Sequence, residues 1–162
     1  MAEGFRVGIG YDIHRLAEGR RLIVGGIEIP HDKGLVGHSD ADVVLHAVTD
    51  ALLGAAGLPD IGDLFPDTDP QFKDADSREL LTEAMKRVNE QGFRPGNLDI
   101  IIHAEAPKMS PYKSRIGESI ADLVGMAPER VSVKAKTNEG LGPLGCSDAI
   151  ACTAVASLEP RT

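Results

Sequence analysis

The sequence predicts an α+β fold, in which β-strands and α-helices build a single domain over residues 1–162. Segments that alternate apolar and polar residues, such as 5–13 and 130–137, indicate strands. Apolar residues that recur with a 3.6-residue period, most clearly over 42–55, indicate helices. The length of 162 residues is that of one ordinary domain and is sufficient for a substantial core.

The first strand, FRVGIGYDI at 5–13, predicts that Asp12 and His14 point to the same side, because side chains two residues apart share a face. A carboxylate and an imidazole placed together form half of a metal site, although a surface turn after a strand is the simpler alternative. Gly8-x-Gly10 looks like the opening of a dinucleotide-binding fingerprint. The third glycine is missing and no helix pattern follows, which excludes that function.

The next segment, RLIVGGIEIP at 21–30, predicts one strand that is kinked or bulged at Gly25–Gly26. Residues 31–39 are then expected to form a loop that leads into a helix. His38 and Ser39 would stand at the start of that helix, where backbone amides and the helix dipole favour an anion such as a phosphate. A plain capping role is the alternative for Ser39.

The helix predicted for 42–57 carries the histidine around which the other candidates are arranged. We expect an N-cap within Ser39–Asp40 and an end at Gly57. Asp42, His46 and Asp50 are spaced by four residues and share one stripe, which suits a metal ligand oriented by a carboxylate. The alternative is a helix histidine paired with one aspartate for structural reasons.

The rest of the chain predicts further helices and strands around one irregular connection. Residues 58–72 contain four aspartates, Asp60, Asp63, Asp67 and Asp69. Their carboxylates are suited to contacts with sugar hydroxyls or metal-bound water, and the alternative is a solvated acidic loop. A capping box at Asp76 opens a helix that ends near Gly92. The remaining elements are expected to be a strand at 97–105, a helix at 111–125, and strands at 130–137 and 149–158.

Composition restricts the partners. The formal net charge of −8 at pH 7 disfavours nonspecific nucleic-acid binding, which depends on many cationic side chains. The first residues lack the pattern of a signal peptide, and the sequence has no apolar run long enough to span a membrane. We therefore expect a cytoplasmic protein with no membrane partner. Cys146 and Cys152 lack the spacing of redox or zinc pairs and are expected to be reduced.

Zinc in a catalytic site takes three protein ligands and leaves one position open. Asp12, His14 and His46 are the smallest set in this sequence that satisfies the requirement. Because the ligands come from two separate segments, only the folded chain can bring them together. The sequence therefore predicts a zinc site between the first strand and the helix.

Four motifs carry a resemblance to one family: GYDIHRL, HSDADVVLHAVTDALLGAAGLPDIGDLFPDTDP, HAEAPKM and VKAKTNE. Together they resemble the 2-C-methyl-D-erythritol 2,4-cyclodiphosphate synthases of non-mevalonate isoprenoid biosynthesis, over residues 6–158. The resemblance implies an α+β subunit with a mixed β-sheet and helices on one face. It also implies a homotrimer with active sites between neighbouring subunits. One departure is that the turn at 140–147 lacks the arginine of many relatives.

The resemblance also implies the reaction. The substrate is the cytidine diphosphate-linked 4-diphosphocytidyl-2-C-methyl-D-erythritol 2-phosphate. Its 2-phosphate attacks the β-phosphorus, CMP leaves, and a cyclic diphosphate forms. Such a phosphoryl transfer needs positioning and charge neutralisation and no enzyme nucleophile, so the lyase requires bound cations and oriented polar groups.

The site residues implied by the resemblance fall into three groups. Asp12, His14 and His46 bind zinc, and Glu139 holds a second cation, Mg²⁺ or Mn²⁺. His38 and Thr137 are the catalytic residues, acting on the phosphates. The substrate contacts are Asp12, His14, His38, Ser39, Asp60, Ile61, Gly62, Phe65, Asp67, Asp69, Ala104, Pro107, Lys108, Met109, Lys136, Thr137, Asn138 and Glu139.

Two other functions use the same residues. A zinc hydrolase would hold a water molecule on the three ligands and use Asp60 or Glu139 as its base. It would leave the lysine, histidine and serine loops unexplained. A noncatalytic trimer that binds nucleotide or metal is the third possibility, and release of CMP from the cytidyl substrate distinguishes it from an enzyme.

Overall fold

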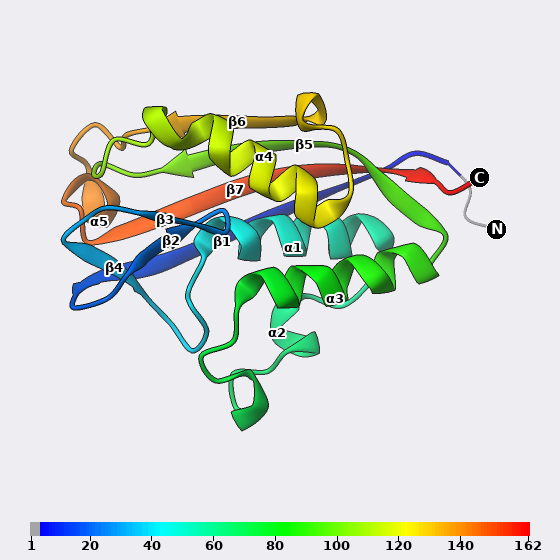
Figure 1. Cartoon of the computed structure of the whole chain (residues 1–162), viewed down its shortest axis with the longest axis horizontal. Helices are drawn as coiled ribbons and strands as arrows, with labels where there is room; N and C mark the ends of the chain where they lie inside the picture. The colour runs from blue at the N-terminus through cyan, green and yellow to red at the C-terminus, as the bar shows by residue number, and fades with distance from the viewer. Residues whose placement is uncertain (1–3) are drawn as a thin grey trace.

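The computed structural model describes residues 4–162 and shows a mixed β-sheet with helices packed against one face (Figure 1). The sheet is five-stranded, with the order β4-β1-β7-β5-β6. Only its last pair, β5 and β6, is parallel. The strands are β1 (Arg6–Glu18), β4 (Lys33–Val36), β5 (Phe93–His103), β6 (Val131–Lys136) and β7 (Ala149–Pro160). The predicted α+β class is confirmed.

Three long helices, α1 (Val43–Ala56), α3 (Ser77–Glu90) and α4 (Lys113–Val124), cover that face. Short helical turns are α2 (Ile61–Leu64), α5 (Gly142–Gly145) and the 3₁₀ segments Pro70–Phe72, Ser110–Tyr112 and Pro128–Arg130. The predicted long helices are confirmed, with shifts of one or two residues at their ends. None of the helices in the described part is long and apolar enough to cross a membrane.

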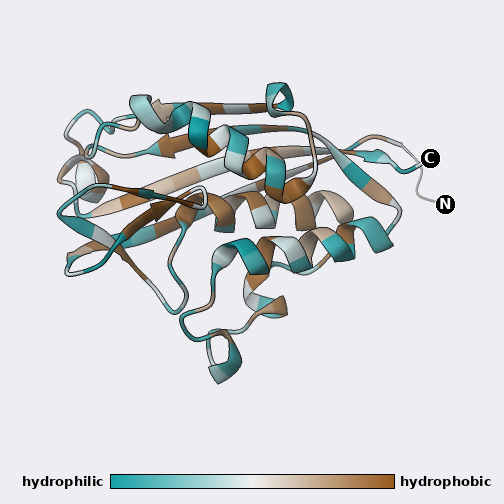
Figure 2. Ribbon diagram, in the orientation of Figure 1, coloured by the Kyte–Doolittle hydropathy of each residue, from teal (hydrophilic) through white to brown (hydrophobic). Residues whose placement is uncertain are grey.

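The central helix α1 lies directly on β1 because two glycines of that strand leave room for it. A Cβ atom at Gly8 would collide with the carbonyl oxygen of Ala51, and one at Gly10 with that of Ala47. This close approach, not dinucleotide binding, explains the Gly8-x-Gly10 pattern. It also buries α1 almost completely, and hydrophobic residues dominate this helix (Figure 2).

The prediction of one kinked strand over 21–30 is wrong. The segment is a hairpin of β2 (Leu22–Val24) and β3 (Ile27–Ile29), joined at Gly25 and Gly26. Both glycines have positive φ, 63° and 80°, which matches a two-residue turn of the primed type that reverses the chain. The loop predicted for 31–39 likewise contains β4, which pairs with the end of β1.

The predicted N-cap of α1 is also wrong, because the helix begins after Asp42 and not after Ser39 or Asp40. The Asp42 side chain is fully buried. Its carboxylate accepts hydrogen bonds from the backbone nitrogens of Leu45 at 3.0 Å, Gly25 at 2.9 Å and Gly26 at 2.7 Å. Asp42 therefore ties the β2–β3 turn to α1 and is not available to orient His46.

Asp42→Ala is expected to lower the free energy of unfolding by about 3 kcal/mol. Loss of a helix cap costs about 1 kcal/mol, and each buried amide left unpaired costs about 1–3 kcal/mol. Asp42→Asn keeps a carbonyl oxygen for the cap and should lose about half as much. Urea unfolding at one fixed subunit concentration measures both variants. An alanine variant as stable as the unmutated chain would contradict this role.

Candidate active site

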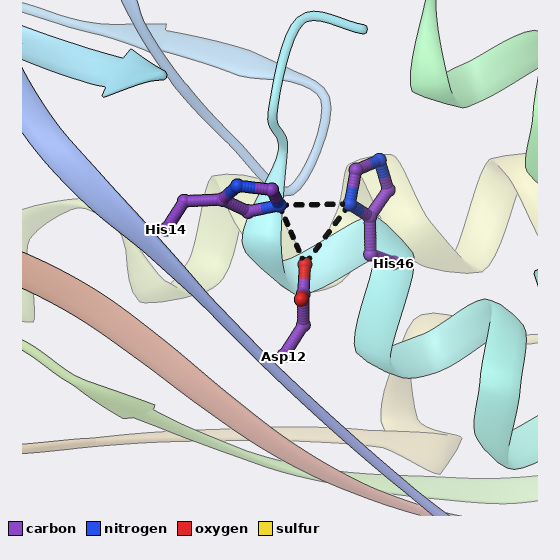
Figure 3. Close-up of side chains that lie close together, drawn as sticks. All are labelled: Asp12, His14 and His46. Atoms are coloured by element: carbon purple, nitrogen blue, oxygen red, sulfur yellow. Dashed lines mark hydrogen bonds and ion pairs between the residues drawn. The ribbon is translucent and has the colours of Figure 1, made fainter. Parts of the chain in front are cut away.

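Three potential metal ligands meet between β1 and α1 (Figure 3). The Oδ2 atom of Asp12 lies 2.8 Å from Nε2 of His14 and 2.9 Å from Nδ1 of His46. The two ring nitrogens are 3.2 Å apart. Asp12 and His14 share the face of β1 that packs against α1, as the alternation of the strand predicted.

The spacing of these atoms fits a single cation. Ligands that bond zinc at about 2.0–2.1 Å in a tetrahedral arrangement stand about 3.3 Å apart, close to the separations found between the three side chains. The side chains are 26%, 19% and 13% exposed for Asp12, His14 and His46. The cluster is thus partly buried and open on one side. The three residues form a possible divalent-metal site.

The electrostatics of the cluster keep its carboxylate ionised. Burial by itself would raise the pKa of Asp12, but hydrogen bonds and charge interactions with His14 and His46 outweigh it and lower this pKa to about 2. Burial would lower the pKa of His14, but the hydrogen bond and charge of Asp12 raise it instead. A permanent negative charge therefore faces the two imidazoles at neutral pH.

Partners outside the cluster determine which ring nitrogens face inward. Nδ1 of His14 donates to the carbonyl oxygen of Val36 at 3.0 Å, which leaves Nε2 free to bind a metal. On His46, Nε2 lies 2.9 Å from the hydroxyl of Ser77 and 3.2 Å from that of Ser39. Sequence reasoning missed Ser77, because nothing in its local pattern separates it from an ordinary first residue of a helix.

The predicted stripe of Asp42, His46 and Asp50 does not act as a unit. Asp42 caps the helix, and Asp50 accepts a hydrogen bond from the backbone nitrogen of Ile61 at 2.8 Å. Asp50 therefore holds α2 against α1. The carboxylate beside His46 is Asp12, which comes from the neighbouring strand and not from the helix. The three residues do lie four apart on the helix, but Asp42 and Asp50 are engaged by backbone nitrogens and neither pairs with His46.

A pocket of about 290 Å³ opens beside the cluster. The ligands His14 and His46 form one wall. His38 and Ser39 enter it from the loop before α1, as the sequence predicted. The Nε2 atom of His38 is buried and has no hydrogen-bond partner among the described residues. An unpartnered buried nitrogen in a pocket wall is a group suited to a ligand. The remaining lining residues are Ile61, Gly62, Phe65, Asp67, Phe72 and Leu80.

The acidic connection after α1 is more ordered than predicted. Asp60 caps α2 through the nitrogen of Asp63 at 2.9 Å, and Asp69 caps the turn at 70–72 through Gln71 at 3.0 Å. These two carboxylates are not part of the pocket lining. Sequence reasoning missed Phe72, whose ring packs edge-on against Phe65 with 5.4 Å between ring centroids. The pair builds an aromatic wall of the pocket.

The other predicted residues form a second group at the carboxyl ends of β5 and β6. The nitrogen of Ala104 donates to the carbonyl oxygen of Lys136 at 2.9 Å. The carboxylate of Glu105, which was not predicted, accepts from the nitrogens of Asn138 at 2.9 Å and Gly140 at 3.2 Å. The segments 104–109 and 136–139 therefore lie side by side, as parallel strands require.

Within one chain, this second group is separate from the pocket. Residues 104–109 and 136–139 do not contribute to its lining. Strand β6 stands three places from β1 in the sheet, which corresponds to about 14 Å at the usual spacing of strands. The structure thus brings the predicted residues together as two groups and not as one.

Comparison with known proteins gives matches that span the segments of both groups. The model of the YgbB family matches residues 5–159. The 2-C-methyl-D-erythritol 2,4-cyclodiphosphate synthase of Bordetella avium is 58% identical over 158 residues, which cover 98% of each chain. The synthase of Listeria monocytogenes serotype 4a is 57% identical over 154 residues, 95% of this chain and 98% of the relative.

Solved structures agree with these matches. The bifunctional IspDF of Campylobacter jejuni superposes with a TM-score of 0.94 at 42% identity, over 98% of this chain and 43% of that one. The CDP complex of IspF from Plasmodium falciparum gives a TM-score of 0.87 at 34% identity and covers both chains completely. One of these similar proteins therefore carries a cytidine nucleotide.

Proposed function

The chain belongs to the YgbB family, and we propose that Asp12, His14 and His46 hold a zinc ion at its active site. The enzyme is a lyase that converts 4-diphosphocytidyl-2-C-methyl-D-erythritol 2-phosphate to 2-C-methyl-D-erythritol 2,4-cyclodiphosphate. CMP is the leaving group. The observation that carries the metal assignment is the triangle of ligand atoms, 2.8–3.2 Å on a side, which opens into the pocket beside His38.

The proposed reaction is an intramolecular displacement. An oxygen of the 2-phosphate attacks the β-phosphorus, the bond from that phosphorus to the bridging oxygen breaks, and CMP departs with this oxygen. A bound zinc ion would supply positive charge to the phosphate oxygens. The protein groups hold the reacting phosphates in line, which is the main source of rate in phosphoryl transfer.

The pocket residues suit the phosphate and the sugar. The free Nε2 of His38 can hold a proton toward a phosphate oxygen, and the hydroxyl of Ser39 can donate a second hydrogen bond. We assign the methylerythritol hydroxyls to the start of α2, at Asp60, Ile61 and Gly62. Phe65 and Asp67 line the pocket, and Asp69, which lies outside the lining, is assigned to its rim.

The second group suits the cytidine diphosphate. The half-buried chain around Pro107, backed by the buried side chain of Met109, provides an apolar surface for the base, and exposed Lys108 provides a positive charge. The remaining contacts are assigned to Ala104, Lys136, Thr137, Asn138 and Glu139. A carboxylate at the end of β6 is a suitable ligand for Mg²⁺ or Mn²⁺, so Glu139 is the proposed holder of the second cation.

A zinc hydrolase is less compatible with this geometry. Its base would have to reach a water molecule on the metal. Asp60 is engaged as the cap of α2 through the nitrogen of Asp63, and Glu139 is the proposed ligand of the second cation, so neither carboxylate is free to act as that base. The named relatives are synthases, which also argues against a noncatalytic binding protein. The cyclase therefore remains the preferred function.

The separation of the two groups is explained if the active site forms between subunits. The uncovered face of the sheet carries an apolar stripe on β1, where Val7, Ile9 and Tyr11 are 58%, 70% and 57% exposed. Large apolar residues side by side on one face mark a protein–protein contact. We propose that the stripe packs in a homotrimer and brings the second group of one subunit to the pocket of the next.

Complementation between two inactive variants tests this arrangement. His46→Ala damages the pocket and Lys108→Ala damages the second group. When the two are co-expressed, one site in each mixed trimer, or about a quarter of all sites after random assembly, should combine two intact halves and recover CMP release. Light scattering should give the mass of a trimer for each variant. A fully active monomer, or mixed trimers without recovered activity, would contradict a shared site.

A further inference from the structure

Ser77, the first residue of α3, reaches the side of the His46 ring opposite the metal cluster. Its side chain is only 1% exposed, and its hydroxyl oxygen lies 2.9 Å from Nε2 of His46. The same hydroxyl makes a short hydrogen bond to Oδ1 of Asp40, and the Ser77 backbone nitrogen donates to Oδ2 at 3.0 Å. Ser77 therefore bridges a metal-ligand ring and a carboxylate.

The available protons fix the direction of this bridge. A serine hydroxyl has one proton to donate, and an ionised carboxylate can only accept. The proton of Ser77 therefore goes to Asp40, and the Ser77 oxygen accepts the proton on Nε2 of His46. With that proton on Nε2, the lone pair of the neutral ring is on Nδ1. Nδ1 is the atom that faces Asp12 at 2.9 Å, and a cation bound between these two atoms would take the place of the proton that they otherwise share.

The bridge is anchored at both ends. Oδ1 of Asp40 also accepts from the nitrogen of Asp42 at 3.1 Å, and the Asp40 nitrogen donates to the carbonyl oxygen of Ala75 at 3.1 Å. The nitrogen of Asp74 donates to the carbonyl oxygen of His38 at 2.9 Å. These backbone bonds attach the loop before α1 to the start of α3. These bonds hold Asp40 in place, so it would not move with the His46 ring if the ring rotated.

The same arrangement determines where the hydroxyl proton of Ser39 can point. Its hydroxyl oxygen lies 3.2 Å from Nε2 of His46 and accepts from the nitrogen of Ala41 at 3.2 Å. Nε2 of His46 has a single proton, which it donates to Ser77 at the shorter distance. The hydroxyl proton of Ser39 is therefore not used in a hydrogen bond to His46. That proton can be donated into the pocket, where a phosphate oxygen would accept it.

We propose that Ser77 is a positioning residue, which with Asp40 holds His46 in the orientation and tautomer that metal binding requires. The inference rests on the zinc site of the proposed function, which names only the three direct ligands. Partners of this kind raise the basicity of a ligand histidine, and their loss typically weakens metal binding by about 10–100-fold.

The test measures zinc affinity by competition with a chelator and the visible spectrum of the cobalt-loaded protein. Ser77→Ala is expected to raise the zinc dissociation constant by about 10–100-fold and to change the cobalt absorption bands, because the ring loses its fixed orientation. Ser157→Ala is the matched control. Ser157 is also buried, at 6% exposure, and its hydroxyl bonds to Asn97 away from the site. It should leave both readouts unchanged.

Asp40→Asn provides a second test of the positioning role proposed for Ser77. It should weaken zinc binding in the unmutated background and add little in the Ser77→Ala background, because residues that act through one chain of hydrogen bonds are not additive. Equal zinc affinity and an unchanged cobalt spectrum in Ser77→Ala would overturn the role of Ser77 alone. Failure of the unmutated chain to bind zinc would overturn the zinc assignment itself, and this inference with it.

Discussion

The His46→Ala variant is expected to lose zinc and CMP release together. His46 contributes one of three ligand atoms, and the two that remain, on Asp12 and His14, both lie on β1. Two ligands leave half of a tetrahedral shell without protein donors. Zinc affinity should therefore fall by more than the roughly 10–100-fold that loss of an outer partner costs.

Metal analysis of the purified variant, together with an assay of CMP, measures this result. His31→Ala is the control, because His31 lies outside the pocket lining, and it should retain one zinc per subunit. Treatment of the unmutated chain with a chelator should reproduce the defect, and added zinc should reverse it. Stoichiometric, chelator-resistant zinc in His46→Ala would contradict the ligand assignment.

His38→Ala is expected to lower turnover by about 10²- to 10³-fold, the usual effect of removing one preorganised donor to a developing charge. The fold and the zinc content should survive, since Nε2 of His38 makes no hydrogen bond within the described chain. Glutamine at this position keeps an N–H donor and should recover part of the rate. Thr137→Ala and Glu139→Gln should slow the same step.

A single turnover with substrate labelled at the β-phosphorus examines the mechanism of that step. Direct attack by the 2-phosphate predicts that all label moves from substrate to the cyclic product without a stage on the protein. His38, Thr137 and Glu139 then act on phosphate oxygens and cations and not as nucleophiles. Label trapped on the protein at the rate of catalysis would overturn this account.

The sequence predicted the parts of the fold that depend on local periodicity. The helices and the strands β1, β5, β6 and β7 follow from their apolar patterns, and Asp12 and His14 share a face because a strand alternates. The hairpin at 21–30 was missed because an apolar strand with two central glycines looks the same whether it bends or reverses. Only the positive φ of Gly25 and Gly26 distinguishes the two.

The candidate site was predictable to a smaller extent. Residue type and motif pointed to the three ligands, His38 and Ser39. The roles of Asp42, Ser77 and Glu105 depend on contacts between segments far apart in the chain, which no local pattern records. The division of the site into two groups likewise follows from the order of strands in the sheet.

Phosphorus NMR of the reaction mixture tests the central claim most directly. The zinc-loaded chain, incubated with 4-diphosphocytidyl-2-C-methyl-D-erythritol 2-phosphate, is expected to produce CMP and the cyclic diphosphate in equal amounts. A zinc hydrolase would also release CMP, but the remaining product would be an open-chain bisphosphate. An open-chain product, or no CMP at all, would contradict an enzyme that positions the 2-phosphate for attack on the β-phosphorus.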